Sequence, residues 1–418
     1  MHVTGFRDPF LAPWTAMDAL RQSKPTLYGL ISGGIHDSGP RTFLYAVDPT
    51  NLASWTYLHP LVEDIPPNFV PSEKWAGDFG VNWECTGFVT LTDDRGHVRE
   101  CVVSGAEGGM ERPWVTKYHA SRPKAARRTP RYQNWCFGRL GKRDDEQVRL
   151  SVEMAGLVDW GIFYAASLLV AEDGRNMLWG WIIEEDLDEA ELARKGWTGC
   201  LGLPREIFLA TITGVVGALA SPLESIGSVE LEKDSDGSNT VITFGHRPIR
   251  EFTALRGQTL FDLPPGPLQP MVSCLQSAPM AYEIQAVMGI SDDTDSISFY
   301  LRHDDDMSIH TSIVFRPKDE TITIDRSHST NRQDINVSPE VGSHTLFRIQ
   351  HTSPPQGVLE PLRLRVFLDH DLIEVFANDR FALSTRVYTD KEARGLSLGV
   401  QGKATVEELR AWKIGELG

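Results

Sequence analysis

Two short stretches of the chain place carboxyl groups in settings that suit acid–base chemistry. The first, Gly-Phe-Arg-Asp-Pro-Phe over residues 5–10, sets Asp8 between Arg7 and Pro9. A neighbouring guanidinium favours the ionised form of a carboxyl group. Proline fixes the local backbone, which suits a side chain that is aimed at a ligand. We therefore expect Asp8 to stay charged.

The second stretch, Asn-Trp-Glu-Cys-Thr-Gly-Phe, sets Glu84 between Trp83 and Cys85, just ahead of an apolar run. Both neighbours are residue types that are often buried, so we expect the carboxyl of Glu84 to be partly shielded from water. Shielding disfavours the charged form and raises the pKa of a carboxyl group. A carboxyl that keeps its proton near neutral pH is what a general acid requires.

Two carboxyl groups whose environments drive their pKa values apart divide the acid and base roles in glycoside hydrolysis. The same motifs also fit a structural interpretation. In that alternative Asp8 caps a turn and pairs with Arg7, while Glu84 is a half-buried strand residue.

The elements that must position these residues are short strands. Turn-forming residues at 93–96 and 172–175 separate some of them, and the acidic-to-basic segment 184–196 predicts a helix whose charges suit its dipole. Closely spaced strands with Gly and Asp turns are typical of an all-β sandwich, barrel or propeller. The predicted strands of this half lie at 26–32, 42–47, 87–92, 100–105, 162–170 and 176–184.

Strands with a two-residue period resume in the second half, where Leu-Arg-Leu-Arg-Val-Phe (362–367) alternates almost perfectly. Between the halves, residues 246–270 form a passage that becomes rich in Pro and Gly and is typical of a linker. We therefore predict an all-β chain with a β-propeller domain over 1–246, a linker over 247–269 and a β-sandwich over 270–418.

The composition excludes several kinds of partner. The 418 residues carry a formal net charge of −16, which opposes binding to nucleic acid or anionic membranes, and no 18-residue apolar run occurs. The basic cluster at 122–131 is interpreted as a solvated loop rather than a nucleic-acid patch. No CxxC pair occurs among the five cysteines, so we expect no metal site and no cofactor. Few cysteines, one glycosylation sequon at 336–338 and no signal peptide favour a cytoplasmic location.

The motifs resemble those of glycoside hydrolase family 32, which contains invertases, inulinases and fructosyltransferases. Arg-Asp-Pro at 7–9 and Glu-Cys at 84–85 are similar to two of its acidic motifs, and further similar stretches follow in order at 158–187, 196–209 and 364–388. The resemblance is strongest to the fungal branch. It implies a five-bladed β-propeller joined to a C-terminal β-sandwich, and cleavage of sucrose or fructans by a retaining mechanism, with fructosyl transfer left open.

Carried over residue by residue, the resemblance implies that Glu84 is the general acid/base and Asp8 the transition-state stabiliser. Arg7 would hold Asp8 and contact the sugar, and Trp181 would form an aromatic wall of the site. Core packing is the alternative for Trp181. Cys85 follows the acid/base in the family and either borders the substrate or fills space. Asp159 and Tyr164 match the family as well, and for these we expect structural roles.

The sequence departs from the family at one essential position. The family's nucleophile is an aspartate in a Trp-Met-Asn-Asp-Pro-type motif upstream of Arg-Asp-Pro, and the sequence holds no evident substitute for it. We therefore expect an N-terminally incomplete propeller. Three explanations stay open: a truncated sequence, a non-catalytic sugar-binding relative, or a partner chain that fills the gap. Homo-oligomerisation is also left open.

Overall fold

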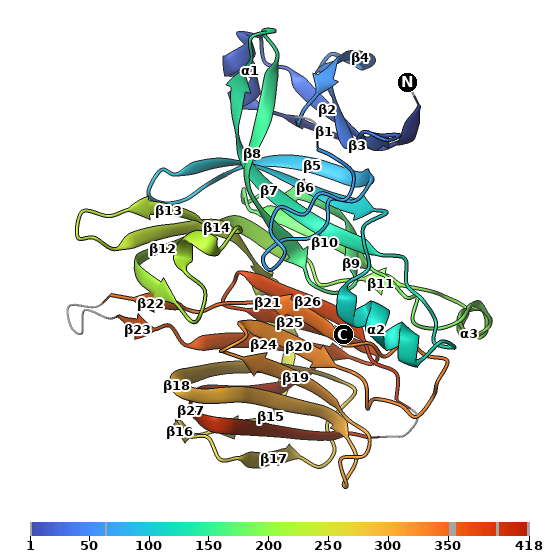
Figure 1. Cartoon of the computed structure of the whole chain (residues 1–418), viewed down its shortest axis with the longest axis vertical. Coiled ribbons are helices and arrows are strands. Elements are labelled where there is room, and N and C mark those ends of the chain that lie inside the picture. Colours follow the sequence, from blue (N-terminus) through green and yellow to red (C-terminus); the bar gives the residue numbers. More distant parts are fainter. Residues whose placement is uncertain (1, 63–64, 351–356, 390–392, 416–418) are drawn as a thin grey trace.

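A computed structural model describes residues 2–62, 65–350, 357–389 and 393–415. Three antiparallel sheets are stacked above a large β-sandwich, with the sheet nearest the N-terminus at the top of the view (Figure 1). The chain is therefore mainly β, as predicted. In the described part of the chain, no helix is both long and apolar enough to cross a membrane.

The elements of the stacked sheets run in chain order, and short helices connect some of them. They are β1 (Val3–Pro13), α1 (Thr15–Arg21), β2 (Leu27–Ile35), β3 (Gly39–Asp48), β4 (Asn51–Pro60), β5 (Asn82–Thr92), β6 (Val98–Glu107), α2 (Pro113–Ser121), β7 (Arg131–Lys142), β8 (Val148–Asp159), β9 (Phe163–Val170), β10 (Asn176–Ile182), α3 (Glu189–Lys195), β11 (Cys200–Leu201), β12 (Arg205–Ala218), η1 (Leu223–Ser225), β13 (Glu230–Lys233) and β14 (Asn239–Pro248). The predicted helix at 184–196 is confirmed as α3, which Asp188 caps by accepting a hydrogen bond from the backbone of Glu191.

Each of the stacked sheets is built like a propeller blade. Strands β1 to β4 form one four-stranded sheet in sequential order, and β5 to β8 form the next. The third contains β9, β10, β12, β14 and β13. Large side chains such as Trp14, Tyr28 and Trp83 fill one apolar core of this region, and Trp135, Phe163 and Phe244 belong to the next. Burial of these faces fixes the stacking of the sheets.

The second half folds as the predicted sandwich. Its elements are η2 (Arg250–Leu255), β15 (Arg256–Leu263), β16 (Gly266–Pro267), β17 (Met271–Leu275), β18 (Ala281–His303), β19 (Thr311–Arg316), β20 (Thr321–Asp325), β21 (Glu340–Ser343), β22 (Phe347–Ile349), β23 (Val358–Leu359), β24 (Leu362–Asp369), β25 (Leu372–Ala377), β26 (Phe381–Arg386) and β27 (Gly395–Ile414). Strand β22 pairs with β12, so the two halves also share a sheet.

The prediction of a linker over 247–269 is wrong for most of that segment. Strands β15 and β16 pair with β27, which makes them part of the sandwich sheet. Arg256 donates two hydrogen bonds to the buried Glu283. Pro and Gly are enriched here because the chain turns repeatedly along the edge of a sheet. An edge strand tolerates proline, which has no backbone N–H to donate to a neighbouring strand.

Buried ion pairs join the blades to the sandwich. Arg205 of β12 is fully buried, and its Nη2 contacts Asp159 at 2.7 Å and Glu374 at 3.3 Å. Asp159 therefore has the structural role that we expected. Arg128, inside the segment interpreted as a solvated loop, instead pairs with Asp186 and Glu340, which corrects that interpretation. Burial opposes ionisation of Asp186, but nearby guanidinium groups outweigh this effect and lower its pKa.

The buried His246 next to this network should make folding pH-dependent. Burial first, and the charge of Arg205 second, lower the pKa of His246 to about 3. Because the unfolded chain takes up this proton below a pKa of about 6.5, stability is complete above that pH and falls as the pH drops toward 3. Between pH 7 and pH 5 the loss from His246 should be about 2 kcal/mol, given a folded-state pKa of about 3. Urea unfolding at both pH values measures it.

A His246→Phe variant serves as the test of this assignment, since Phe244 already packs beside the imidazole. Between pH 7 and pH 5, the free energy of unfolding of the variant should fall by about 2 kcal/mol less than that of the unmodified protein. An unchanged pH dependence in the variant would assign the effect to other groups.

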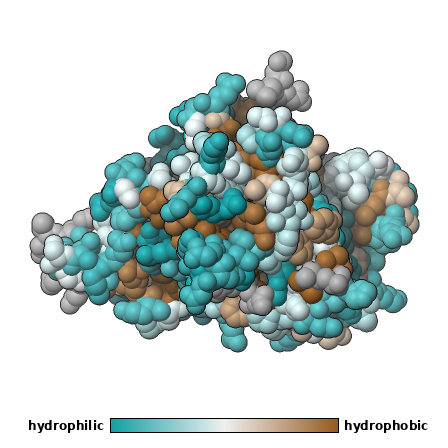
Figure 2. Space-filling model, turned by 90° about the horizontal axis from the view of Figure 1, so that it is seen from above, coloured by the Kyte–Doolittle hydropathy of each residue, from teal (hydrophilic) through white to brown (hydrophobic). Residues whose placement is uncertain are grey.

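Some large apolar side chains of the blades remain exposed. Phe6, Leu52 and Tyr57 of the first sheet are 49% to 58% exposed, and Trp179 and Leu201 of the third sheet are also exposed. From above, hydrophobic side chains appear between hydrophilic ones over this end of the molecule (Figure 2). The blades thus present apolar sheet surface that the described chain does not bury.

Candidate active site

Three β-bulges shape the region where the predicted acidic residues meet. Asp8, Cys85 and Ala165 all have positive φ angles, of 57°, 47° and 51°. The pairing of β1 with β2, of β5 with β6 and of β9 with β10 shifts register at these points. Left-handed backbone is uncommon for residues other than glycine, and bulges re-aim side chains beside functional sites. Each sheet therefore uses a bulge to direct a polar residue toward a shared site.

Arg7 lies at the centre of this polar cluster. Its Nε and Nη2 donate to Oε1 of Glu84 at 2.8 and 2.5 Å, and Nη2 also contacts Oε2 of Glu107 at 2.5 Å. The Nε of Arg7 lies 3.9 Å from Oδ2 of Asp8. The hydrogen bond with Glu84 is the largest of the effects that raise the pKa of Arg7, so the guanidinium stays charged. Arg7 thus lies within ion-pair distance of Asp8, but its hydrogen bonds go to the two glutamates.

Asp8 is held against the strand that carries Glu84. Its Oδ2 accepts a hydrogen bond of 3.2 Å from the backbone N–H of Cys85. The two predicted acidic residues, 76 positions apart in the chain, thus meet in one cluster. Burial, followed by the charges of Asp8 and Glu84, raises the pKa of the Cys85 thiol to about 12. A thiol that stays neutral is a poor nucleophile, which agrees with a packing role for Cys85.

The environment of Glu84 differs from the expected one. Trp83 is 1% exposed and donates its indole N–H to the carbonyl of Phe79 in a core that does not include Glu84. Instead, the hydroxyl of Tyr164 donates to Oε2 of Glu84 at 2.8 Å. Alternate side chains of a strand point to opposite faces, so a neighbour in sequence cannot shield Glu84 as the motif suggested. The side chain of Glu84 is 17% exposed.

Tyr164 is a core residue, as expected, and its hydroxyl in addition contacts Glu84. Its ring is buried, and burial together with the Glu84 charge raises the pKa of its hydroxyl far above the usual value. Tyr164 therefore keeps its proton and acts as a donor to Glu84. Trp181 is its cross-strand neighbour and is 36% exposed. The position suits an aromatic wall, and that role of Trp181 stays a prediction.

Glu107 and Asn82 belong to the cluster and were missed in the sequence. They are directly opposite each other on β6 and β5, and the Asn82 amide donates to Oε2 of Glu107 at 3.1 Å. The two-residue period places Asn82 on the same face as Glu84. The available signal was Glu107 followed by two glycines, just after the predicted strand 100–105. That pattern is too common to identify a site residue. In the described part of the chain, no group of three or more His, Cys, Asp or Glu residues is placed to hold a metal ion.

Gly105 leaves the space that the Tyr164 ring occupies. A Cβ atom at position 105 would lie 2.9 Å from two ring carbons of Tyr164. Because this ring is buried and cannot move freely, Gly105→Ala should lower the free energy of unfolding by about 1–3 kcal/mol. Urea unfolding measures the change. Gly141→Ala, on the neighbouring strand with open space around it, is the matched control and should be nearly neutral. Equal effects of both substitutions would contradict this packing.

Family models match most of the chain. The model described as "Glycosyl hydrolases family 32 N-terminal domain" matches residues 4–216, and the model described as "Glycosyl hydrolases family 32 C terminal" matches residues 257–413. The second match begins within β15, in agreement with the pairing of that strand in the sandwich.

Curated relatives are distant and longer. An acid beta-fructofuranosidase from Arabidopsis thaliana is 24% identical over 339 residues, which cover 73% of this chain and 46% of the relative. A 6(G)-fructosyltransferase from Asparagus officinalis is 26% identical over 267 residues, which cover 59% and 39% of the two chains. This chain therefore spans less than half the length of these relatives.

Solved structures share the fold. A fructosyltransferase from A. japonicus has a TM-score of 0.82 and 24% identity, and the match covers 98% of this chain and 72% of that one. A beta-fructofuranosidase from Aspergillus kawachii, complexed with glycerol, has a TM-score of 0.81 and 25% identity, with coverage of 98% and 71%. The likeness extends through the blades and the sandwich.

Proposed function

Since this chain belongs to glycoside hydrolase family 32, we propose that the protein acts on sucrose or fructans as a β-fructofuranosidase-type glycosidase. One observation carries the proposal: Asp8 and Glu84 come from different sheets and meet around one arginine. Two carboxyl groups that flank the scissile bond are the machinery of glycoside hydrolysis.

Glu84 is the proposed general acid/base. One of its carboxyl oxygens accepts hydrogen bonds from Arg7, and the other accepts one from Tyr164. To donate a proton to the oxygen leaving the fructosyl carbon, Glu84 must be protonated and loosen one of these contacts. Glu107 offers Arg7 a second anionic partner at 2.5 Å, which permits such an exchange.

Asp8 is the proposed stabiliser of the transition state. The backbone N–H of Cys85 fixes one carboxylate oxygen, which leaves the other available to fructosyl hydroxyls. A fixed negative charge lowers the energy of an oxocarbenium-like transition state, because it does not have to reorganise as positive charge develops.

A retaining route further needs a nucleophilic carboxylate about 5–5.5 Å from the acid/base. Asp8 and Glu107 are the carboxylates that share Arg7 with Glu84 in the described residues, and neither stands in the motif that the resemblance associates with the nucleophile. A sugar-binding role without turnover is therefore the outcome against which the proposal is tested.

The test is incubation of the protein with sucrose and with a short fructan, followed by quantification of free fructose and of transfer products. Release of fructose supports the glycosidase, and longer oligosaccharides would add fructosyl transfer. Saturable binding of sucrose in calorimetry without release of fructose would overturn the catalytic proposal in favour of a sugar-binding protein.

A further inference from the structure

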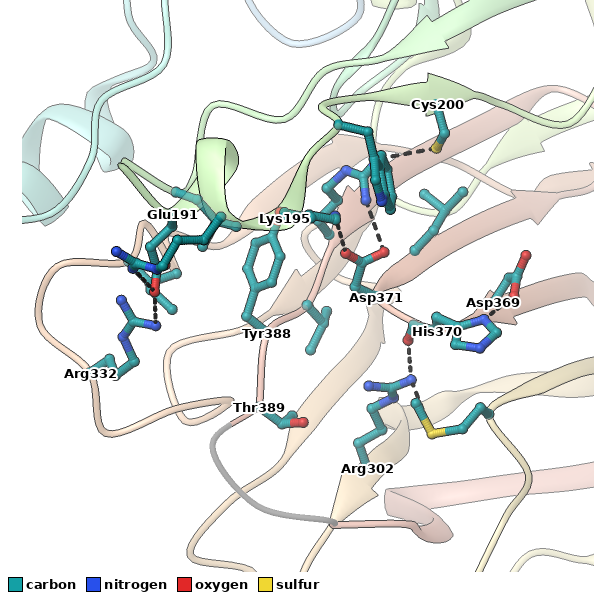
Figure 3. A pocket seen from close by; sticks show the side chains of 18 of the residues that line it. Glu191, Lys195, Cys200, Arg302, Arg332, Asp369, His370, Asp371, Tyr388 and Thr389 are labelled. Carbon is teal, nitrogen blue, oxygen red and sulfur yellow. Dashed lines mark hydrogen bonds and ion pairs between the residues drawn. The ribbon is translucent and has the colours of Figure 1, made fainter. Parts of the chain in front are cut away.

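A large cavity lies at the junction of the blades and the sandwich, apart from the acidic cluster. Its volume is about 790 Å³. From the blades it is lined by α3 and β11, and from the sandwich by the β24–β25 turn and the ends of β18 and β26 (Figure 3). A cavity of this size at a domain junction is typical of small-molecule sites.

The lining is locally cationic in an acidic protein. The chain carries a net charge of −16. The described lining nevertheless has five cationic side chains against three carboxylates: Arg194, Lys195, Arg302, Arg332 and Arg386 against Glu191, Asp369 and Asp371. This local excess of cationic side chains is opposite in sign to the net charge of the protein.

Most of these cations already have carboxylate partners. Lys195 contacts Asp371 at 3.2 Å and Arg386 contacts the same carboxylate at 2.8 Å. Arg332 contacts Glu191 at 2.7 Å. The opposite charges in these pairs largely cancel, so the paired cations are not free to bind an anion.

Arg302 is the exception. It is 8% exposed, and in the described residues its guanidinium contacts uncharged groups rather than forming an ion pair. Its Nη2 donates to the carbonyl oxygen of His370 and approaches the sulfur of Met280 at 3.8 Å. Figure 3 places this guanidinium below Asp371 and beside His370. Burial is the main cause of the lowered pKa of Arg302, and the nearby charges of Asp371 and Asp369 offset it only in part.

We propose that this cavity binds a small organic oxyanion whose phosphate or carboxylate group pairs with Arg302. The planar guanidinium matches both groups, and in the part of the chain that the structure describes its Nε and Nη1 have no acceptor, so N–H groups remain for an oxyanion. The uncharged part of the ligand would lie toward Trp197, which is 52% exposed. The inference does not depend on the proposed glycosidase activity.

Calorimetric titration of the protein with inorganic phosphate and with citrate, at constant ionic strength and pH 7, tests the proposal and separates the two anion types. We expect saturable binding of at least one anion, weakened at least about tenfold in Arg302→Met. Arg302→Lys keeps the charge but not the fork and should give an intermediate affinity. Arg139→Met, a 64% exposed arginine on β7, is the control and should bind as the unmodified protein does.

A second measurement covers the case in which Arg302→Met does not fold. Binding should change the fluorescence of Trp197, and Trp197→Phe should remove that change while calorimetry still detects the anion. Equal affinity in Arg302→Met and the unmodified protein, or no saturable binding of either anion, would overturn the proposal. Fructose release is measured separately, so a failure here is distinct from a failure of the proposed glycosidase.

Discussion

Replacing Glu84 by glutamine should reduce fructose release from sucrose by about 10²–10⁴-fold, the usual contribution of a general acid/base. Glutamine keeps the shape of the side chain. Its amide oxygen can accept from Arg7 and its amide nitrogen can donate to the hydroxyl of Tyr164, but it cannot deliver a proton to the leaving oxygen. The loss should therefore appear in kcat, with sucrose binding largely retained. Steady-state kinetics with sucrose measures it.

A measurement of stability and a control variant separate a loss of catalysis from a loss of folding. Arg7 is 41% exposed, so loss of its ion pair with Glu84 should cost at most about 1 kcal/mol of stability. Glu153→Gln, on the exposed part of β8, is the matched control and should leave kcat unchanged. Full activity of Glu84→Gln would rule out the acid/base role.

Replacing Arg205 by methionine should destabilise the fold by about 3–5 kcal/mol, the range found when one partner of a buried ion pair is removed. The guanidinium is fully buried and contacts Asp159, Glu374 and the hydroxyl of Ser384. Its removal leaves two carboxylates of the domain junction without their cation. Urea unfolding at pH 8 measures the change.

The pH dependence of this variant gives an independent check. Burial raises the pKa of Glu374 and Arg205 counteracts it, so loss of Arg205 must raise this pKa further. A raised carboxyl pKa in the folded state makes stability complete below the unfolded pKa of about 4.3 and lost as the pH rises. The deficit of Arg205→Met should therefore be smaller at pH 5 than at pH 8.

Arg247 offers the matched control for this experiment. It pairs with Glu206, the residue next to Arg205, but is 44% exposed. Arg247→Met should cost no more than about 1 kcal/mol, because exposed ion pairs contribute little. A comparable loss in both variants would mean that burial of the Arg205 network does not determine its contribution.

Local patterns in the sequence predicted what depends on neighbours along the chain. Alternation of apolar and polar residues at 362–367 predicted β24, and the charge gradient at 184–196 predicted α3, since both patterns follow from the geometry of one element. Asp8 and Glu84 were identified because their motifs lie within short contiguous stretches. The family and the order of the two halves followed from the same stretches.

The tertiary structure decided which side chains meet. Arg7 donates hydrogen bonds to Glu84 and Glu107 rather than to the adjacent Asp8, and Tyr164 rather than Trp83 covers Glu84. Arg7 lies 77 residues from Glu84 and 100 from Glu107 in the chain, and Tyr164 lies 80 residues from Glu84. These contacts depend on strand register and on bulges. A one-residue change of register moves every side chain to the other face of a sheet, so local sequence cannot specify such contacts. Only the assembled sheets determine the partners of each carboxylate.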